Sequence, residues 1–133
     1  MNSGMPTNSK TKVFVIDDEQ FIRESLAGYL EDCEFDVISA ESAEEALDRL
    51  KSDHCDVAIV DLRLPGMNGD ALIQEIYKQL PNTRFLIHTG SVDYRLSKDL
   101  EAIGLCSDDV FFKPQHDLSL FVDKINQFIQ ASQ

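Results

Sequence analysis

Short apolar runs alternate with amphipathic stretches along the chain. Five runs of mostly apolar residues, flanked by charged, Gly or Pro residues, are typical of strands: 12–16, 35–40, 57–60, 84–88 and 110–112. After each run, apolar residues recur three or four positions apart, which predicts helices at 22–30, 43–50, 69–80, 92–103 and 118–129. The pattern is therefore a strand followed by a helix, five times over.

The run Val57–Val60 is the clearest of these strands. All four of its residues are apolar, so we expect it to be buried on both faces, as central strands of parallel sheets are. Pro65, Gly66, Asn68 and Gly69 then end regular structure and force a loop. Together with the alternation, this predicts an α/β fold: a doubly wound, five-stranded parallel sheet with five helices on its two faces and right-handed crossovers.

One domain accounts for residues 11–131. The chain has 133 residues, of which 43% are hydrophobic and 27% charged, which is ordinary for a globular domain with a real core. Residues 1–10 are mainly Ser, Asn, Gly, Pro and Thr, so we expect a disordered tail there. No run approaches the roughly 18 apolar residues of a membrane span, and we expect a cytoplasmic protein.

Acidic residues outnumber basic ones by 24 to 12, and the formal net charge is -12. This charge argues against direct binding to nucleic acid or to an anionic membrane, and it suits basic partner surfaces or cations. Cys33, Cys55 and Cys106 form no CxxC pair and no Cys/His cluster at zinc-ligand spacing, so we expect reduced thiols.

Polar residues stand at the ends of four of the five expected strands. Asp17 and Asp18 follow the first strand, Asp61 follows the third, and Thr89 and Lys113 follow the fourth and fifth. The carboxyl ends of parallel strands share one edge of the sheet, and ligands of open α/β folds bind there. We therefore expect these five side chains to converge.

The chemistry of these groups suits phosphoryl transfer. Clustered carboxylates repel one another unless a cation neutralises them, and hard oxygen ligands suit Mg²⁺. A carboxylate can also act as a nucleophile towards phosphorus, while a cation, an ammonium and a hydroxyl stabilise the phosphoryl oxygens. Each residue alone has a simpler explanation: the acidic residues 17–19 as a helix cap, Asp61 as a cap or turn residue, Thr89 as a turn residue and Lys113 as a solvated side chain.

Four motifs together resemble the receiver domain of bacterial two-component response regulators, the CheY-like fold. The resemblance covers roughly residues 12–129 and implies the strand order 2-1-3-4-5 of flavodoxin-like sheets. The motifs are Val15-Ile16-Asp17-Asp18-Glu19, the segment from Asp61 to Gly69, His88-Thr89-Gly90 and Lys113-Pro114.

The resemblance implies a phosphorylation site and a metal site. Asp61 resembles the residue that accepts a phosphoryl group from a phosphohistidine on a sensor histidine kinase or a phosphotransfer protein. Asp18 and Asp61, with the main-chain carbonyl of Arg63, resemble the direct ligands of Mg²⁺. Asp17 resembles a ligand that acts through water.

The resemblance also implies a switch. Thr89 resembles the hydroxyl that turns towards the phosphate, and Lys113, with a cis bond to Pro114, resembles the partner of another phosphoryl oxygen. Two features depart from the family: Val110 stands where an aromatic residue is usual, and the stretch 105–109 is longer than usual. Because Val110 is small and stiff at its first torsion, we expect phosphorylation to move mainly the loop after Thr89 and the start of the following helix.

We therefore expect a phosphorylation-dependent signalling module that assists its own phosphorylation and dephosphorylation but turns over no outside substrate. It would be a monomer or a weak phosphorylation-dependent dimer, partnered by a sensor histidine kinase or phosphotransfer protein and by an effector protein or domain. One alternative is a receiver-like interaction module that never uses the phosphate. Another is an aspartyl-phosphate phosphatase of the haloacid-dehalogenase type, which needs a second Asp where Arg63 stands. Without an effector domain, the chain is a stand-alone receiver or part of a longer protein.

Overall fold

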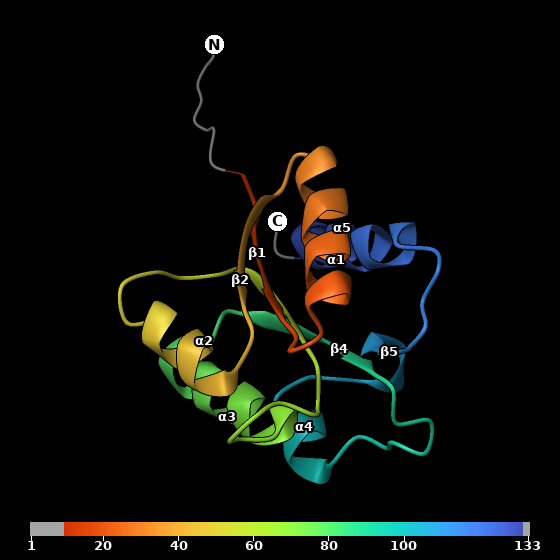
Figure 1. The fold of residues 1–133 in the computed structure, drawn as a ribbon. Coiled ribbons are helices and arrows are strands. Elements are labelled where there is room, and N and C mark those ends of the chain that lie inside the picture. The colour runs from red at the N-terminus through yellow and green to blue at the C-terminus, as the bar shows by residue number, and fades with distance from the viewer. Residues whose placement is uncertain (1–9, 132–133) are drawn as a thin grey trace.

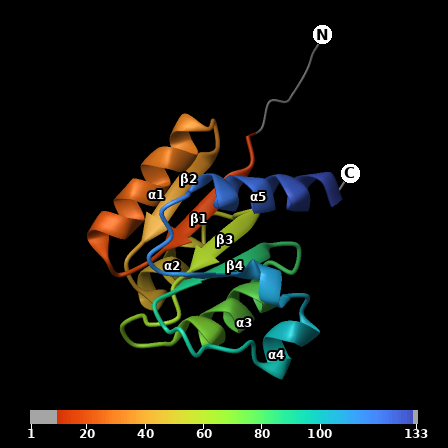
Figure 2. The same ribbon diagram turned by 90° about the vertical axis from the view of Figure 1, so that its right-hand side faces the viewer.

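A five-stranded parallel sheet lies between two layers of helices in the computed structural model, which describes residues 10–131 (Figures 1 and 2). The tail expected at residues 1–10 lies outside the described residues, apart from Lys10. The strands are in the order 2-1-3-4-5, so the doubly wound fold is confirmed: β1 (Lys12–Ile16), β2 (Asp36–Ala40), β3 (Val57–Val60), β4 (Arg84–Thr89) and β5 (Val110–Phe112).

In the described part of the chain, five α-helices and a short 3₁₀ helix connect and follow the strands. Helices α1 and α5 cover one face of the sheet, and α2, α3 and α4 cover the other (Figures 1 and 2). Among residues 10–131, no helix is long and apolar enough to cross a membrane. The helices are α1 (Gln20–Asp32), α2 (Ala43–Arg49), α3 (Gly69–Gln79), α4 (Lys98–Ala102), the 3₁₀ helix η2 (Ser107–Asp109) and α5 (Ser119–Ala131).

Strand β3 belongs to both halves of the core. Successive strand residues point to opposite faces, so Val57 and Ile59 pack towards α1 and α5, while Ala58 and Val60 pack towards α2, α3 and α4. All four are buried, as expected from the unbroken apolar run. The register places Val60 opposite Ile16, the last residue of β1, and opposite Ile87 of β4, which continues to Thr89 at the same edge of the sheet.

The structure corrects the helix expected at 92–103, because only Lys98–Ala102 is helical. The Ser97 hydroxyl accepts a hydrogen bond from the Leu100 amide at 3.2 Å and so caps the helix at this point. Before it, the Tyr94 amide donates to the Ser91 carbonyl at 3.0 Å and closes a turn. The apolar periodicity was therefore misleading over 92–97, a loop whose first apolar residue, Val92, is 70% exposed.

Candidate functional site

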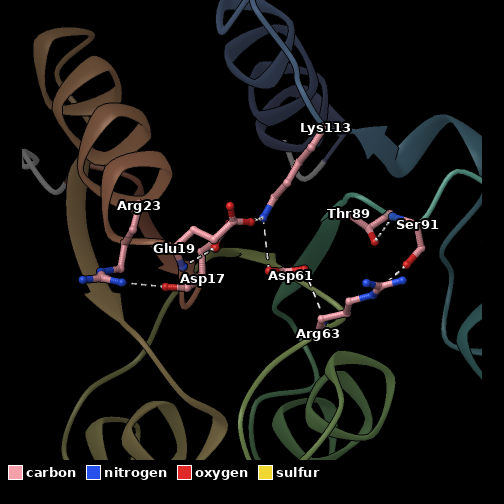
Figure 3. A network of polar contacts seen from close by, with 8 residues as sticks. All are labelled: Asp17, Glu19, Arg23, Asp61, Arg63, Thr89, Ser91 and Lys113. Atoms are coloured by element: carbon pink, nitrogen blue, oxygen red, sulfur yellow. Dashed lines mark hydrogen bonds and ion pairs between the residues drawn. The ribbon is translucent and has the colours of Figure 1, made fainter.

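Three strand ends bring their polar side chains together around Lys113 (Figure 3). Its Nζ lies 3.0 Å from Oδ2 of Asp17, 3.1 Å from Oδ2 of Asp61 and 2.7 Å from Oε1 of Glu19. The side chains of Asp17 and Asp61 are each only 4% exposed, and that of Lys113 is 10% exposed. The structure thus brings residues that follow β1, β3 and β5 into one ion cluster, in which only Glu19 is exposed.

Electrostatics at this cluster favour the charged lysine. Burial lowers the pKa of Lys113, but its hydrogen bonds to Glu19 and Asp17 outweigh burial and raise the pKa above its ordinary value. Burial raises the pKa of Asp17, although the Glu19 amide and Lys113 act against it. One ammonium therefore faces several carboxylates and leaves negative charge uncompensated.

Four acidic residues could hold a cation here. Asp17, Asp18, Glu19 and Asp61 each offer an oxygen atom, and these atoms lie within 4.8 Å of one another. Asp18 and Glu19 are exposed, so an ion can reach the cluster from solvent. A set of carboxylate oxygens at the surface is the donor type that Mg²⁺ prefers, and the residues present fit this ion.

The acidic turn after β1 is held by its own backbone contacts. Asp17 Oδ1 accepts a hydrogen bond from the Glu19 amide at 2.9 Å, and Arg23 Nη1 donates to the Asp17 carbonyl at 2.7 Å. Glu19 is the N-cap of α1, but its side chain makes no capping hydrogen bond. The helix-cap explanation of this triplet is thus correct only in part, because two of its carboxylates also face Lys113.

The loop after β3 fixes the position of Asp61. The Arg63 amide donates to Asp61 Oδ1 at 3.1 Å, and the Gly69 amide donates to the Leu62 carbonyl at 2.9 Å. A Cβ atom at Gly69 would lie 2.5 Å from the Asp61 carbonyl oxygen and 2.8 Å from Leu62 Cα, closer than real Cβ contacts allow. Only Gly lets α3 start this close to the backbone of Asp61.

Thr89 is completely buried at the end of β4, beside the cluster (Figure 3). Its carbonyl accepts from the Lys113 amide at 2.7 Å, which ties the backbone of the two strand ends together. Its hydroxyl accepts from the Ser91 amide at 3.0 Å, as a turn residue would. The Lys113–Pro114 peptide bond is cis, as the resemblance implied.

Sequence reasoning assigned Glu19, Ser91 and Gly69 no part in the phosphorylation or metal site. Glu19 makes the shortest contact to Lys113, and its signal was its place beside Asp18 in the acidic triplet. Ser91 links two loops, because its hydroxyl accepts from Arg63 Nε at 3.1 Å (Figure 3). Nothing in the sequence marks that contact, since the two residues are 28 positions apart.

The two features that the resemblance marked as departures lie at β5 and just before it. The longer stretch before the strand folds into η2, where Asp109 accepts from the Cys106 amide at 3.0 Å and lies 3.1 Å from Lys124 Nζ. Val110 is partly buried against the α2–α4 side of the core. Phe111 is buried and Phe112 is 40% exposed, as strand alternation predicts.

Comparison with known proteins places this geometry in a family. The response regulator receiver domain family matches residues 13–126. A probable transcriptional regulator, ycf27, of Porphyridium aerugineum is 35% identical over 105 residues, which are 79% of this chain and 42% of that protein. The two-component response regulator PhoP of Pseudomonas aeruginosa is 35% identical over 103 residues, 77% of this chain and 45% of that protein. The chain thus spans less than half the length of these two relatives.

Solved structures share the fold. The receiver domain of the Francisella response regulator 1452 has a TM-score of 0.78 and 24% identity, over 92% of this chain and 99% of that one. The response regulator TrrA of Thermotoga maritima, in complex with Mg²⁺-BeF, has a TM-score of 0.74 and 27% identity, over 89% of this chain and 98% of that one. Because the family model matches most of its length, the chain belongs to the response regulator receiver domain family.

Proposed function

We propose that this chain is a phosphorylation-dependent receiver in a two-component phosphorelay. Asp61 accepts a phosphoryl group from a phosphohistidine on a sensor histidine kinase or a phosphotransfer protein. The observation that carries this proposal is the buried carboxylate of Asp61, 3.1 Å from Lys113 Nζ and within an acidic group open to solvent. A nucleophile, a fixed positive charge and room for a cation are what phosphoryl transfer to a carboxylate requires.

The transfer is a simple displacement at phosphorus. A carboxylate oxygen of Asp61 attacks, the new O–P bond forms, and the N–P bond of the phosphohistidine breaks. The leaving imidazole keeps the electron pair of that bond and takes up a proton. Lys113 is placed to bind a phosphoryl oxygen, and the hydroxyl of Thr89 can turn from the Ser91 amide towards another.

Mg²⁺ would be held by Asp17, Asp18, Asp61 and the main-chain carbonyl of Arg63. When bound, Mg²⁺ supplies positive charge that neutralises the carboxylates and the phosphoryl oxygens. Support comes from the carboxylate oxygens that lie within 4.8 Å of one another and from TrrA, whose structure contains Mg²⁺-BeF. As the resemblance implies, Asp17 would act through a water molecule.

Labelling with a small phosphodonor tests the site. With acetyl phosphate and Mg²⁺, the intact mass should rise by one phosphoryl group, and the adduct should be stable in acid and labile in base. Asp61→Asn should abolish the adduct. Asp56→Asn is the matched control, because this exposed carboxylate precedes the opposite end of β3. Label that persists in Asp61→Asn would overturn the assignment.

Labelling tests the first alternative, and an assay of turnover on small phosphate esters tests the second. A phosphate-independent interaction module would take no label under any donor. A phosphatase would release phosphate from small esters in steady turnover, but Arg63 stands where its second Asp would be needed.

We propose a cytoplasmic protein that binds no nucleic acid or membrane directly and whose output is contact with an effector protein or domain.

A further inference from the structure

We propose that Tyr94 is the aromatic side chain that reports phosphorylation of Asp61 to the surface around α4 and β5, in place of the aromatic residue absent at Val110. This inference rests on the proposed function of Asp61. It names which side chain carries the signal out of the site, and by which contacts.

A short chain of hydrogen bonds joins Tyr94 to the phosphorylation site. The Tyr94 amide donates to the Ser91 carbonyl at 3.0 Å, and the Ser91 amide donates to Thr89 Oγ1 at 3.0 Å. On a second path, Arg63 Nε donates to Ser91 Oγ at 3.1 Å, and the Arg63 amide donates to Asp61 Oδ1 at 3.1 Å. Both paths therefore meet at Ser91, and Figure 3 shows its two hydrogen bonds, one to Thr89 and one to Arg63, as dashed lines.

Tyr94 lines two hollows at the surface. It lines a hollow of about 490 Å³ together with Ser91 and Asp70, on the side of the site. It also lines a hollow of about 610 Å³ together with Val110 and Phe112, on the side of α4 and β5. Tyr94 and Val110 both pack against the same core cluster, so the ring stands where it can respond to the site and reshape the outer surface.

The hydroxyl of Tyr94 has no hydrogen-bond partner among the described residues, although it is buried. Burial, with a smaller effect from Asp70, raises the pKa of Tyr94 to about 12, so the phenol is neutral at physiological pH. An unpaired buried hydroxyl is unfavourable, and a modest shift of the ring towards Asp70 or towards solvent would relieve it. The resting position is thus one that the ring can leave.

Phosphorylation would act on both hydrogen-bond paths that lead to Ser91. When the Thr89 hydroxyl turns towards a phosphoryl oxygen, the Ser91 amide loses its acceptor. When Asp61 carries the phosphoryl group, the Arg63 amide must share or leave Asp61 Oδ1. The turn from Ser91 to Tyr94 then moves, the ring moves with it, and the hollow beside Val110 changes shape.

Fluorine NMR can follow this ring directly, because the chain has three tyrosines and no tryptophan. Protein labelled with 3-fluorotyrosine should give three resonances, and Tyr94→Phe identifies the one of interest. With Mg²⁺ and beryllofluoride, the Tyr94 resonance should shift severalfold more than those of Tyr29 and Tyr77. Thr89→Ala should reduce this shift to the level of Tyr77, and Thr89→Ser should restore it.

Thr83→Ala is the matched control, because Thr83 is also a buried threonine but lies just before the opposite end of β4. It should leave the Tyr94 shift unchanged. If acetyl phosphate labels Asp61 but the Tyr94 resonance moves no more than that of Tyr77, the inference is overturned and the proposed function stands. If no adduct forms at Asp61, the proposed function and this inference are both overturned.

Discussion

The Nζ atom of Lys113 lies 3.1 Å from Oδ2 of Asp61, although the two residues are 52 positions apart in the sequence. The sheet brings them together, because β4 lies between β3 and β5 and their carboxyl ends share one edge. The same ammonium also contacts Asp17 and Glu19. One positive charge therefore offsets three carboxylates, and the stability of this edge depends on it.

Removing that charge should destabilise the protein. Lys113→Ala leaves the buried carboxylates of Asp17 and Asp61 without their partner, and the loss should be on the order of 3 kcal/mol in urea unfolding without Mg²⁺. Adding Mg²⁺ should recover part of it. Lys78→Ala is the control, since that side chain is 72% exposed and pairs only at the surface. Equal unfolding free energies for the two variants would contradict the role of Lys113 in the cluster.

Mg²⁺ should stabilise the folded protein, because the ion binds the native site and not the unfolded chain. At an ion concentration 100 times the dissociation constant, linkage predicts about 2.7 kcal/mol. Asp18→Ala should lose most of the increase in melting temperature, whereas Asp48→Ala, an exposed acid on α2, should keep it. If several millimolar Mg²⁺ leaves the melting temperature of the unmutated protein unchanged, the protein has no metal site.

Two glycine substitutions should have opposite effects. Gly69→Ala places a methyl group against the backbone of Asp61 and Leu62, so the loop must shift, and we expect a loss of 1–3 kcal/mol, roughly the range for overpacking. Labelling by acetyl phosphate should slow as well. Gly28→Ala, in the open interior of α1, should instead stabilise the protein by roughly 0.5–1 kcal/mol. Similar unfolding midpoints for the two variants would refute the close approach at Gly69.

His88 should make stability fall in mild acid. It is 4% exposed, its two ring nitrogens have no partner among the described residues, and its ring meets Phe121 edge-on at 5.0 Å. Burial, helped by Lys113, lowers the pKa of His88 to about 4, although Asp61 and Glu19 act in the other direction. The pKa of His88 is lower in the folded protein than in the unfolded chain, so folding favours the neutral ring. The contribution of this ring to the free energy of unfolding is therefore complete above about pH 6.5 and is lost as pH falls towards 4.

The test compares unfolding free energies at pH 7.5 and pH 5. Between pH 7.5 and pH 5, the unfolding free energy of the unmutated protein should fall by about 2 kcal/mol more than that of His88→Leu, since the leucine cannot be protonated. Both proteins carry the same carboxylates, so the comparison removes their effect. His116→Gln, at an exposed position, should keep the slope of the unmutated protein. A His88→Leu variant with an unchanged slope would show that the buried imidazole does not control this pH dependence.

The sequence by itself determined the order of the strands and helices and the identity of three of the residues that converge. Burial on both faces requires an unbroken apolar run, so Val57–Val60 could be read as a central strand without a structure. Because the ends of parallel strands share an edge, Asp17, Asp61 and Lys113 could be placed together from the order of elements alone. Those inferences depend on local pattern and on a general rule of sheet topology.

Only the tertiary structure decided the contacts that join separate loops. The sequence pattern extended the helix back to Val92, but a capping bond at Ser97 and a turn from Ser91 to Tyr94 override that periodicity. The Ser91–Arg63 contact spans 28 positions and leaves no periodic signal. Periodicity reports which face of an element is apolar, whereas these hydrogen bonds depend on distances between elements, which exist only after the sheet has formed.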